Sequence, residues 1–165
     1  MKPNSFAGPL TRGGLIAAVY VLMTMPFAQF AFGPIQFRPA EALTVLPILF
    51  PEAVPAVFVG VLISNTISQF GMIDIVFGSL ISLAAALVTR WTRGSIIAWL
   101  SPVVFNALFV SVYVAWFIAD EWWTAAYWLA YAQTAISIGI SQAIVVFLLG
   151  LPLVAYIRKA FFREY

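Results

Sequence analysis

Arg38 and Glu41 lie three residues apart, between long apolar segments, in the stretch Gly33-Pro34-Ile35-Gln36-Phe37-Arg38-Pro39-Ala40-Glu41-Ala42-Leu43. A charged side chain near the middle of a bilayer costs about 2.5–3.5 kcal/mol on insertion scales. A chain that keeps two charges this close to hydrocarbon must shelter them within protein or use them on a ligand. We expect Arg38 and Glu41 to help bind a small polar solute.

The composition requires a membrane as the surrounding solvent. Of the 165 residues, 64% are hydrophobic and 8% are charged. In a soluble domain, about 45–50% of the residues are apolar and about 25% are charged. A surface made from this chain could not be wetted by water. We therefore expect an all-α integral membrane bundle, formed by a single domain over residues 1–165.

Several classes of chemistry are excluded or unsupported. The chain has no cysteine and no histidine, which excludes disulfides, thiolate nucleophiles and histidine metal sites. It has no phosphate-binding Gly-x-x-x-x-Gly-Lys-[Ser/Thr] motif, no His-Glu-x-x-His and no Gly-x-Ser-x-Gly. A net charge of +2 gives no sign of a nucleic-acid partner. We expect no catalytic residue, no metal and no cofactor.

Apolar runs divided by proline, glycine and charged breaks predict six transmembrane helices, over residues 14–32, 39–50, 52–69, 73–89, 95–118 and 124–157. The alternative reads 41–68 as one helix and gives five spans. Lysine and arginine concentrate in cytoplasmic loops. Six spans place on one side all the basic residues except Arg38, namely Lys2, Arg12, Arg90, Arg93, Arg158, Lys159 and Arg163. We favour six spans with both termini in the cytoplasm, and the first run as a helix, not a cleaved signal peptide.

A sparse set of polar side chains interrupts the apolar helices. Six spans place most of them at the outer end and leave Asn106 and Gln142 at mid-helix. Amide side chains both donate and accept hydrogen bonds, which suits a heterocycle with mixed edges. Aromatic side chains could stack on its ring, and Phe32 and Trp116 are candidates for this in addition to Phe37 and Phe105. The expected binding residues are Gln36, Phe37, Arg38, Glu41, Asn65, Asp74, Phe105, Asn106 and Gln142.

Each of these residues also has a role that needs no ligand. Arg38 and Glu41 could form a salt bridge that closes a helix start. A lone asparagine or glutamine could join two helices by a hydrogen bond. Asp74 could favour a helix N-terminus through the helix dipole, and a single aromatic side chain could face lipid. Only convergence of many such groups on one chamber favours a binding site.

Small residues four positions apart mark the first helix. Gly13 is followed by Ala17, and Gly14 by Ala18. Such spacing permits close approach of another helix. The partner could be a second protein or another helix of the same chain.

The motif Phe32-Gly33-Pro34-Ile35-Gln36-Phe37-Arg38-x-x-Glu41-Ala42-Leu43-Thr44-x-Leu46-Pro47 resembles the signature of the QueT family. Its members are substrate-binding S components of energy-coupling-factor (ECF) importers for queuosine precursors. The similarity continues through 51–55, Asn65, 74–80, 106–108 and 149–153, and omits the tryptophan-rich stretch 116–128.

This resemblance implies an S component of six helices that captures a 7-deazaguanine, meaning queuine or a queuosine precursor, outside the bacterial plasma membrane. It implies a transmembrane coupling T protein and two cytosolic ABC ATPases as partners, with ATP hydrolysis done by the ATPases. Gly14 and Ala18, with Ala17 beside them, would contact the T protein. The family's site residues carry over best onto Gln36, Arg38, Glu41, Asn65, Asp74 and Asn106.

The chain departs from the family pattern at two positions. Ala40 stands where serine is usual, and Gln142 where glutamate is usual. A glutamate could bind a pair of N–H groups, whereas a glutamine offers one carbonyl and one amide donor. From this change we expect a cationic aminomethyl base to lose more affinity than a neutral one.

Three rival functions remain at this stage. The chain could be an S component for another vitamin, such as riboflavin, biotin or thiamine. It could be a membrane scaffold or assembly protein, which predicts no bound solute. An intramembrane enzyme is a more distant alternative, because no nucleophile–base pair is visible in the sequence.

Overall fold

The computed structural model describes residues 8–32 and 36–161, and these residues form helices and connections without a β-strand. The predicted all-α membrane bundle is confirmed. The α-helices are Pro9–Thr24 (α1), Ala28–Ala31 (α2), Ala53–Ser64 (α3), Ser79–Trp91 (α4), Ile97–Phe105 (α5), Ser111–Ala119 (α6), Ala125–Val145 (α7) and Leu151–Phe161 (α8). Between them lie 3₁₀ helices at Met25–Phe27 (η1), Pro39–Ile48 (η2) and Asn65–Ile67 (η3), and π-helical turns at Asp74–Gly78 (η4), Asn106–Val110 (η5) and Val146–Gly150 (η6).

Consecutive elements join into six apolar helical stretches within the described residues. Four are long and apolar enough to cross a membrane, at Pro9–Ala31, Asp74–Trp91, Ile97–Ala119 and Ala125–Phe161. Two are shorter, at Pro39–Ile48 and Ala53–Ile67. All six correspond to the stretches expected from the sequence, while the number that crosses the bilayer stays a prediction.

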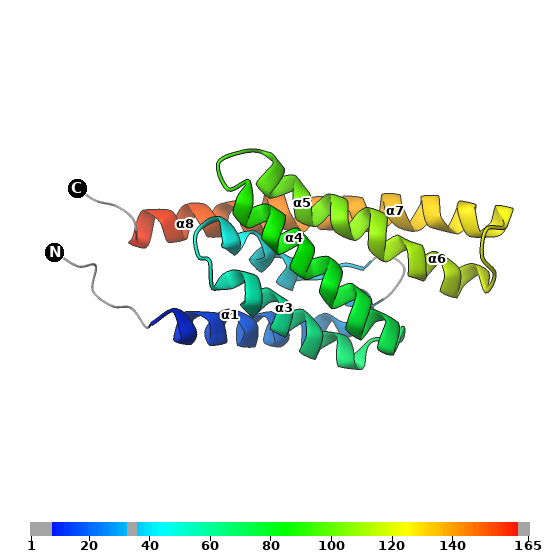
Figure 1. Cartoon of the computed structure of the whole chain (residues 1–165), viewed down its shortest axis with the longest axis horizontal. Helices are drawn as coiled ribbons and strands as arrows, with labels where there is room; N and C mark the ends of the chain where they lie inside the picture. The colour runs from blue at the N-terminus through cyan, green and yellow to red at the C-terminus, as the bar shows by residue number, and fades with distance from the viewer. Residues whose placement is uncertain (1–7, 33–35, 162–165) are drawn as a thin grey trace.

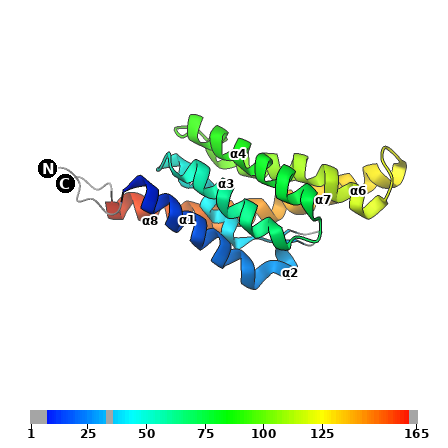
Figure 2. The same ribbon diagram turned by 60° about the horizontal axis from the view of Figure 1, so that its bottom comes forward.

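The two ends of the bundle differ in chemistry. The start of α1, the η2–α3 and α4–α5 connections and the end of α8 lie at one end (Figures 1 and 2). We call this the basic end, because these segments carry Arg12, Arg90, Arg93, Arg158 and Lys159. The other end, which holds the α6–α7 connection, is the aromatic end, and α6 and α7 extend furthest there (Figure 1).

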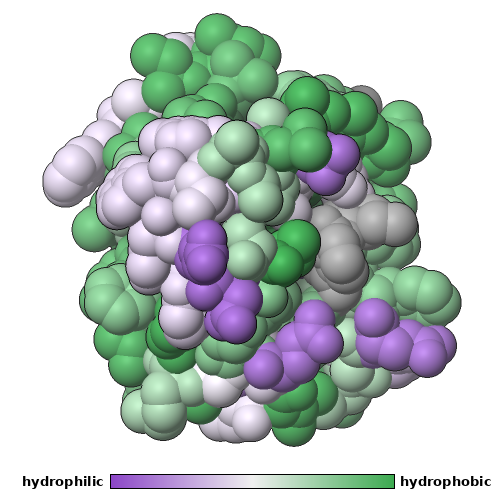
Figure 3. Space-filling model, turned by 90° about the vertical axis from the view of Figure 1, so that its right-hand side faces the viewer, coloured by the Kyte–Doolittle hydropathy of each residue, from purple (hydrophilic) through white to green (hydrophobic). Residues whose placement is uncertain are grey.

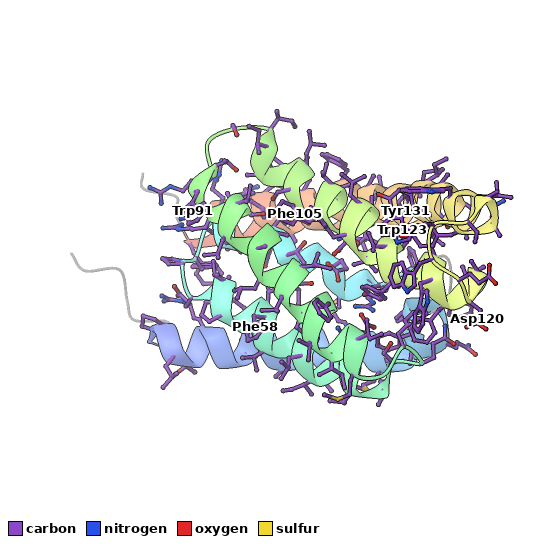
Figure 4. The ribbon with its side chains drawn as sticks, turned by 45° about the vertical axis from the view of Figure 1, so that its right-hand side comes forward. Phe58, Trp91, Phe105, Asp120, Trp123 and Tyr131 are labelled. Carbon is purple, nitrogen blue, oxygen red and sulfur yellow. The ribbon has the colours of Figure 1, made fainter. Side chains whose placement is uncertain are left out.

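Aromatic and acidic side chains dominate that second end. Trp123 and Asp120 both lie there, far from Trp91 at the basic end (Figure 4). Viewed from this side, hydrophilic and pale residues adjoin strongly hydrophobic ones (Figure 3). This mixture suits the boundary between lipid and water, where tryptophan and tyrosine are enriched.

The short helix η2 occupies the interior of the bundle. Pro39 opens it, where a missing N–H costs nothing, and all ten of its residues are buried. As a 3₁₀ helix it rises about 2 Å per residue, so it extends about 20 Å. Gly150 lets the last long helix approach closely, because a Cβ there would lie 3.2 Å from the carbonyl oxygen of Ala42. Other helices therefore shield η2 from lipid, as a short segment at membrane depth requires.

The small residues of α1 divide between two faces. Gly13 and Ala17 face α3: a Cβ on Gly13 would lie 3.6 Å from the carbonyl oxygen of Glu52, and the Ala17 carbonyl lies 3.3 Å from a Cβ placed on Gly60. Gly14 and Ala18 are exposed, and a Cβ on Gly14 would meet no atom within 4 Å. The first pair packs inside the chain, and the second remains available to a partner.

We expect Gly60→Ala to destabilise the bundle by about 1–3 kcal/mol, the usual range for overpacking. An added Cβ would lie 2.8 Å from the Tyr20 Cβ, so α1 and α3 must separate. Thermal unfolding in detergent measures the effect. Gly14→Ala is the matched control, because its Cβ meets open space. Equal midpoints for both variants would show that α1 and α3 do not pack this closely.

Candidate ligand-binding site

Arg38 lies at the entrance to η2, where it is buried and joins three segments. Its Nε donates to the Ala31 carbonyl oxygen at 2.8 Å, and one terminal nitrogen donates to Asn65 Oδ1 at 3.2 Å. The other terminal nitrogen pairs with Asp74 Oδ2 at 3.4 Å. The guanidinium carbon also lies 4.6 Å from the centre of the Phe32 ring, in cation–π geometry. Arg38 therefore links the end of α2, η3 and η4.

Asp74 is the anionic partner in this network. It accepts a hydrogen bond from the Tyr113 hydroxyl at 2.6 Å, while Asn65 Nδ2 donates to its backbone oxygen at 2.8 Å. Gly78 lies so close that a Cβ there would be 2.9 Å from Asn65 Nδ2 and 3.2 Å from the Tyr113 hydroxyl. Only a residue without a side chain fits beside this network.

Glu41 forms a second centre one turn into η2. Tyr20 in α1 donates to its Oε1 at 2.6 Å. Gln142 in α7 donates to its Oε2 at 3.0 Å, and Asn106 in η5 donates to the same oxygen at 3.4 Å. The four side chains come from four elements that are far apart in sequence. All are buried, and the Glu41 side chain is the point where they meet.

The two centres border one cavity. Its lining comes from the entrance to η2, from η4 and α4, from η5 and α6, and from α7: Gln36, Arg38, Glu41, Asp74, Gly78, Ser82, Asn106, Val110, Tyr113 and Gln142. The space among these atoms, including the open mouth, is about 270 Å³. The side chains leave room within it for roughly one water molecule. These side chains thus hold the cavity nearly closed.

Gln36 is the one lining residue with an unsatisfied side-chain donor among the described residues. It is 6% exposed, and its Nε2 has no hydrogen-bond partner. Its backbone φ is +48°, in the left-handed region that a residue with a Cβ rarely adopts. Such strain persists where the surroundings hold it and is common at ligand sites.

Two of the three π-helical turns present side chains to the cavity. Asp74 and Gly78 bound one, and Asn106 and Val110 bound another. A π turn widens a helix locally and changes where its side chains point, which is why such turns recur at functional sites. Sequence periodicity does not reveal them, because it assumes a regular repeat.

Most of the expected binding residues come together here. Six of them line the cavity: Gln36, Arg38, Glu41, Asp74, Asn106 and Gln142. Asn65 does not line it but accepts a hydrogen bond from the Arg38 guanidinium. Phe37 is half-buried and Phe105 contacts Phe109 at 5.4 Å between ring centres; neither lines the cavity. Figure 4 shows Phe105 on α5.

Sequence reasoning missed Tyr20, Tyr113 and Ser82. The two tyrosines carry a hydroxyl into the middle of an apolar helix, whereas tyrosine in membrane proteins is enriched at the interfaces. That unusual depth is the signal that could have identified them. Ser82 gave no such signal, since serine is common within transmembrane helices.

Trp116 leads away from the cavity as part of a chain of aromatic rings. Ring centres lie 5.9 Å apart for Tyr113 and Phe70, 5.1 Å for Phe70 and Phe117, and 5.0 Å for Phe117 and Trp116. Trp116 then stacks on Trp122 at 5.6 Å with an interplanar angle of 15°. These contacts support the protruding α6–α7 hairpin.

The arrangement suits binding more than bond cleavage. The Tyr20 and Tyr113 hydroxyls donate to the Glu41 and Asp74 carboxylates, so both hydroxyl hydrogens are engaged within the network. Among the described residues no group of acidic side chains is arranged to hold a metal ion. The cavity offers donors and acceptors in several directions, which is what recognition of a polar heterocycle requires.

We expect Tyr113→Phe to destabilise the protein by about 1–3 kcal/mol, because the buried Asp74 carboxylate would lose a 2.6 Å hydrogen bond. Thermal unfolding of the ligand-free protein measures this loss. In the control Tyr131→Phe, the lost bond joins a half-exposed hydroxyl to the Leu108 carbonyl, and we expect a change within about 0.5 kcal/mol. A larger loss in the control would mean that the Tyr113 bond is not special.

Comparisons with known proteins agree on one family. The profile of the family described as QueT transporter matches residues 10–159, which is most of the chain. The queuosine precursor transporter QueT of Lactococcus lactis subsp. cremoris (strain MG1363) is 37% identical over 71 residues.

The match to this relative covers 42% of the chain and 41% of the relative, less than half of either protein. No solved structure matches the chain. The family profile extends over the elements that build the cavity, from α1 to α8. Taken with the six apolar helical stretches, this profile match shows that the chain belongs to the QueT transporter family.

Proposed function

We propose that the chain is the substrate-binding S component of an ECF-type importer and captures a 7-deazaguanine from outside the cell. The observation that carries this proposal is the convergence of Glu41, Asn106 and Gln142 on one buried cavity with Arg38 and Gln36. Buried polar groups in a membrane bundle are costly and mark substrate sites.

The chemistry of the lining fits a flat base with a mixed edge. Glu41 keeps one acceptor position for an N–H group of a ligand, and Gln36 offers an unpaired amide donor to a carbonyl. A guanine-type ring carries both an N–H edge and a carbonyl. Riboflavin, biotin and thiamine are larger or more flexible, and the nearly closed cavity favours a small rigid ring.

The position of the cavity fits capture from outside. It lies at the start of η2, away from the basic end. If the basic end faces the cytoplasm, then both termini lie inside and the cavity is nearer the outer surface. The protein would reside in the bacterial plasma membrane as a multi-pass subunit.

Transport needs partners in this proposal. A transmembrane T protein would contact the exposed face of α1 at Gly14 and Ala18, whereas Ala17, expected from the sequence to take part, packs against α3. Two cytosolic ABC ATPases would hydrolyse ATP and reorient the whole subunit, which itself performs no chemistry. A cavity with room for roughly one water requires the lining to open before a base enters.

We expect the purified protein to bind queuine or a simpler 7-deazaguanine with a Kd below about 1 μM, equivalent to about −8 kcal/mol. Asn106→Ala should weaken this binding at least about tenfold, because it removes an amide that lines the cavity. Titration calorimetry in detergent provides the measurement. Gln133→Ala is the control, since Gln133 is exposed on α7, and it should bind normally.

Mass spectrometry of the solute released on denaturation separates the rival functions. A released 7-deazapurine supports the proposal, whereas riboflavin, biotin or thiamine would assign a different vitamin. A protein that releases no solute and binds none of these compounds would be better described as a scaffold.

We expect Gly14→Leu to leave base binding unchanged and to prevent co-purification with a T protein and ATPases. A Cβ at position 14 meets no atom within 4 Å, so a leucine there would project outward from the exposed face of α1. Pull-down of the tagged chain from cells that express all components tests this. Ala132→Leu adds similar bulk on the exposed side of α7 and should not affect assembly. Normal assembly of Gly14→Leu would remove this face of α1 from the interface.

A further inference from the structure

We infer that the cavity selects a positively charged ligand and that Glu41 is the residue that recognises the charge. The inference rests on the proposed function and narrows it to one ligand type, a 7-deazapurine that carries a protonated amine. The same base with a neutral substituent should bind more weakly.

The formal charge of the cavity is negative. Its charged lining residues are Arg38, Glu41 and Asp74, so one guanidinium and two carboxylates leave a net charge of −1. Arg38 is committed to Asp74 by an ion pair of 3.4 Å. Glu41 belongs to neither of the two ion pairs found among the described residues. Glu41 is therefore the one carboxylate of the lining that forms no ion pair, although Arg38 also attracts it from a longer distance.

The surroundings of Glu41 suit an ionised carboxylate. Its three hydrogen-bond partners, Tyr20, Asn106 and Gln142, all donate to it. Hydrogen bonds donated to a carboxylate favour its charged form over the neutral one. A carboxylate has about four acceptor positions, so one remains for a ligand after three are occupied.

Burial makes the missing cation costly. Glu41 is 2% exposed, its hydrogen-bond partners are neutral, and Arg38 acts on it only from beyond ion-pair distance. A carboxylate buried in this way has lost much of its hydration. A protonated amine placed at the remaining acceptor position would offset this loss by direct attraction. A neutral group of the same size would fill the space and leave the charge uncompensated.

A second observation points to a ligand at the same cavity. Gln36 is buried and lines the same cavity, and its Nε2 donor has no partner. Two side chains that border one cavity thus have an interaction unfilled: Gln36 has no acceptor for its amide hydrogens, and Glu41 has no ion-pair partner. A ring carbonyl together with a protonated amine would meet both needs in one molecule.

The position of Gln142 leads us to infer the opposite of the preference expected from its sequence. A glutamine at that position predicts poorer binding of a cationic base if position 142 is the only source of negative charge. However, Gln142 Nε2 lies 3.0 Å from Glu41 Oε2, so a carboxylate is present at the same place. Gln142 orients Glu41 and leaves its charge available.

The test compares two bases of nearly equal size on the purified protein, 7-aminomethyl-7-deazaguanine and 7-hydroxymethyl-7-deazaguanine. At pH 7 the alkyl amine is protonated, as a lysine side chain is. We expect the amine to bind at least about tenfold more tightly, a difference of about 1.4 kcal/mol. In Glu41→Gln this ratio should fall to within about twofold, a loss of about 1 kcal/mol.

Asp120→Asn is the matched control. It makes the same carboxylate-to-amide change on an exposed residue at the aromatic end, and asparagine tolerates its left-handed backbone, φ +55°. This variant should keep the wild-type ratio, and unfolding curves should show that both variants are folded.

Each outcome decides the inference. Equal binding of the two bases by the wild-type protein, or tighter binding of the alcohol, would leave the proposed function intact and overturn the charge selection. A wild-type ratio retained in Glu41→Gln would show that another group recognises the cation. Failure of both bases to bind would refute the proposed function, and with it this inference.

Discussion

The buried ion pair between Arg38 and Asp74 is the interaction on which the rest of the interior depends. Removing one partner of such a pair costs about 3–5 kcal/mol, because the remaining charge is left without hydration. Here the pair also recruits Asn65 and Tyr113, so four elements are held in one arrangement. Arg38 reaches the Ala31 carbonyl as well, which joins the end of α2 to the entrance of η2.

Glu41 depends on this arrangement but has a different role. Its position is fixed from three sides by neutral donors, whereas Asp74 is neutralised by a cation. One carboxylate is thus held in an ion pair and the other by neutral donors. The difference between them follows from the partner of each. Under the proposed function, stability and ligand recognition would rest on these two separate groups.

Irregular helices make this arrangement possible. The 3₁₀ helix η2 is narrow enough to lie inside the bundle, and Gly150 and Gly78 let neighbouring elements approach closely where a side chain would clash. The π turns at 74–78 and 106–110 direct polar side chains inward from helices that are otherwise apolar. The π turns and these two glycines lie beside the cavity or beside η2. Irregular backbone at membrane depth is tolerated where it is buried in protein.

The sequence by itself determined that the chain is helical and lies in a membrane, where the helical stretches fall, and that Arg38 and Glu41 are central. Those conclusions follow from the apolar composition, the proline and glycine breaks and the cost of charge in hydrocarbon. The family motif likewise depends only on local sequence. The sequence also predicted many of the residues that line the cavity, because apolar helices contain few polar side chains.

Tertiary structure decided which charges pair. Glu41 and Arg38, one helical turn apart, are natural partners in sequence, yet Arg38 pairs with Asp74 and Glu41 meets Tyr20 and Gln142. Pairing depends on distances between helices, which local spacing does not contain. The same limit hid Tyr113 and the two faces of α1, since a hydroxyl or a small residue gains its role only from what packs against it.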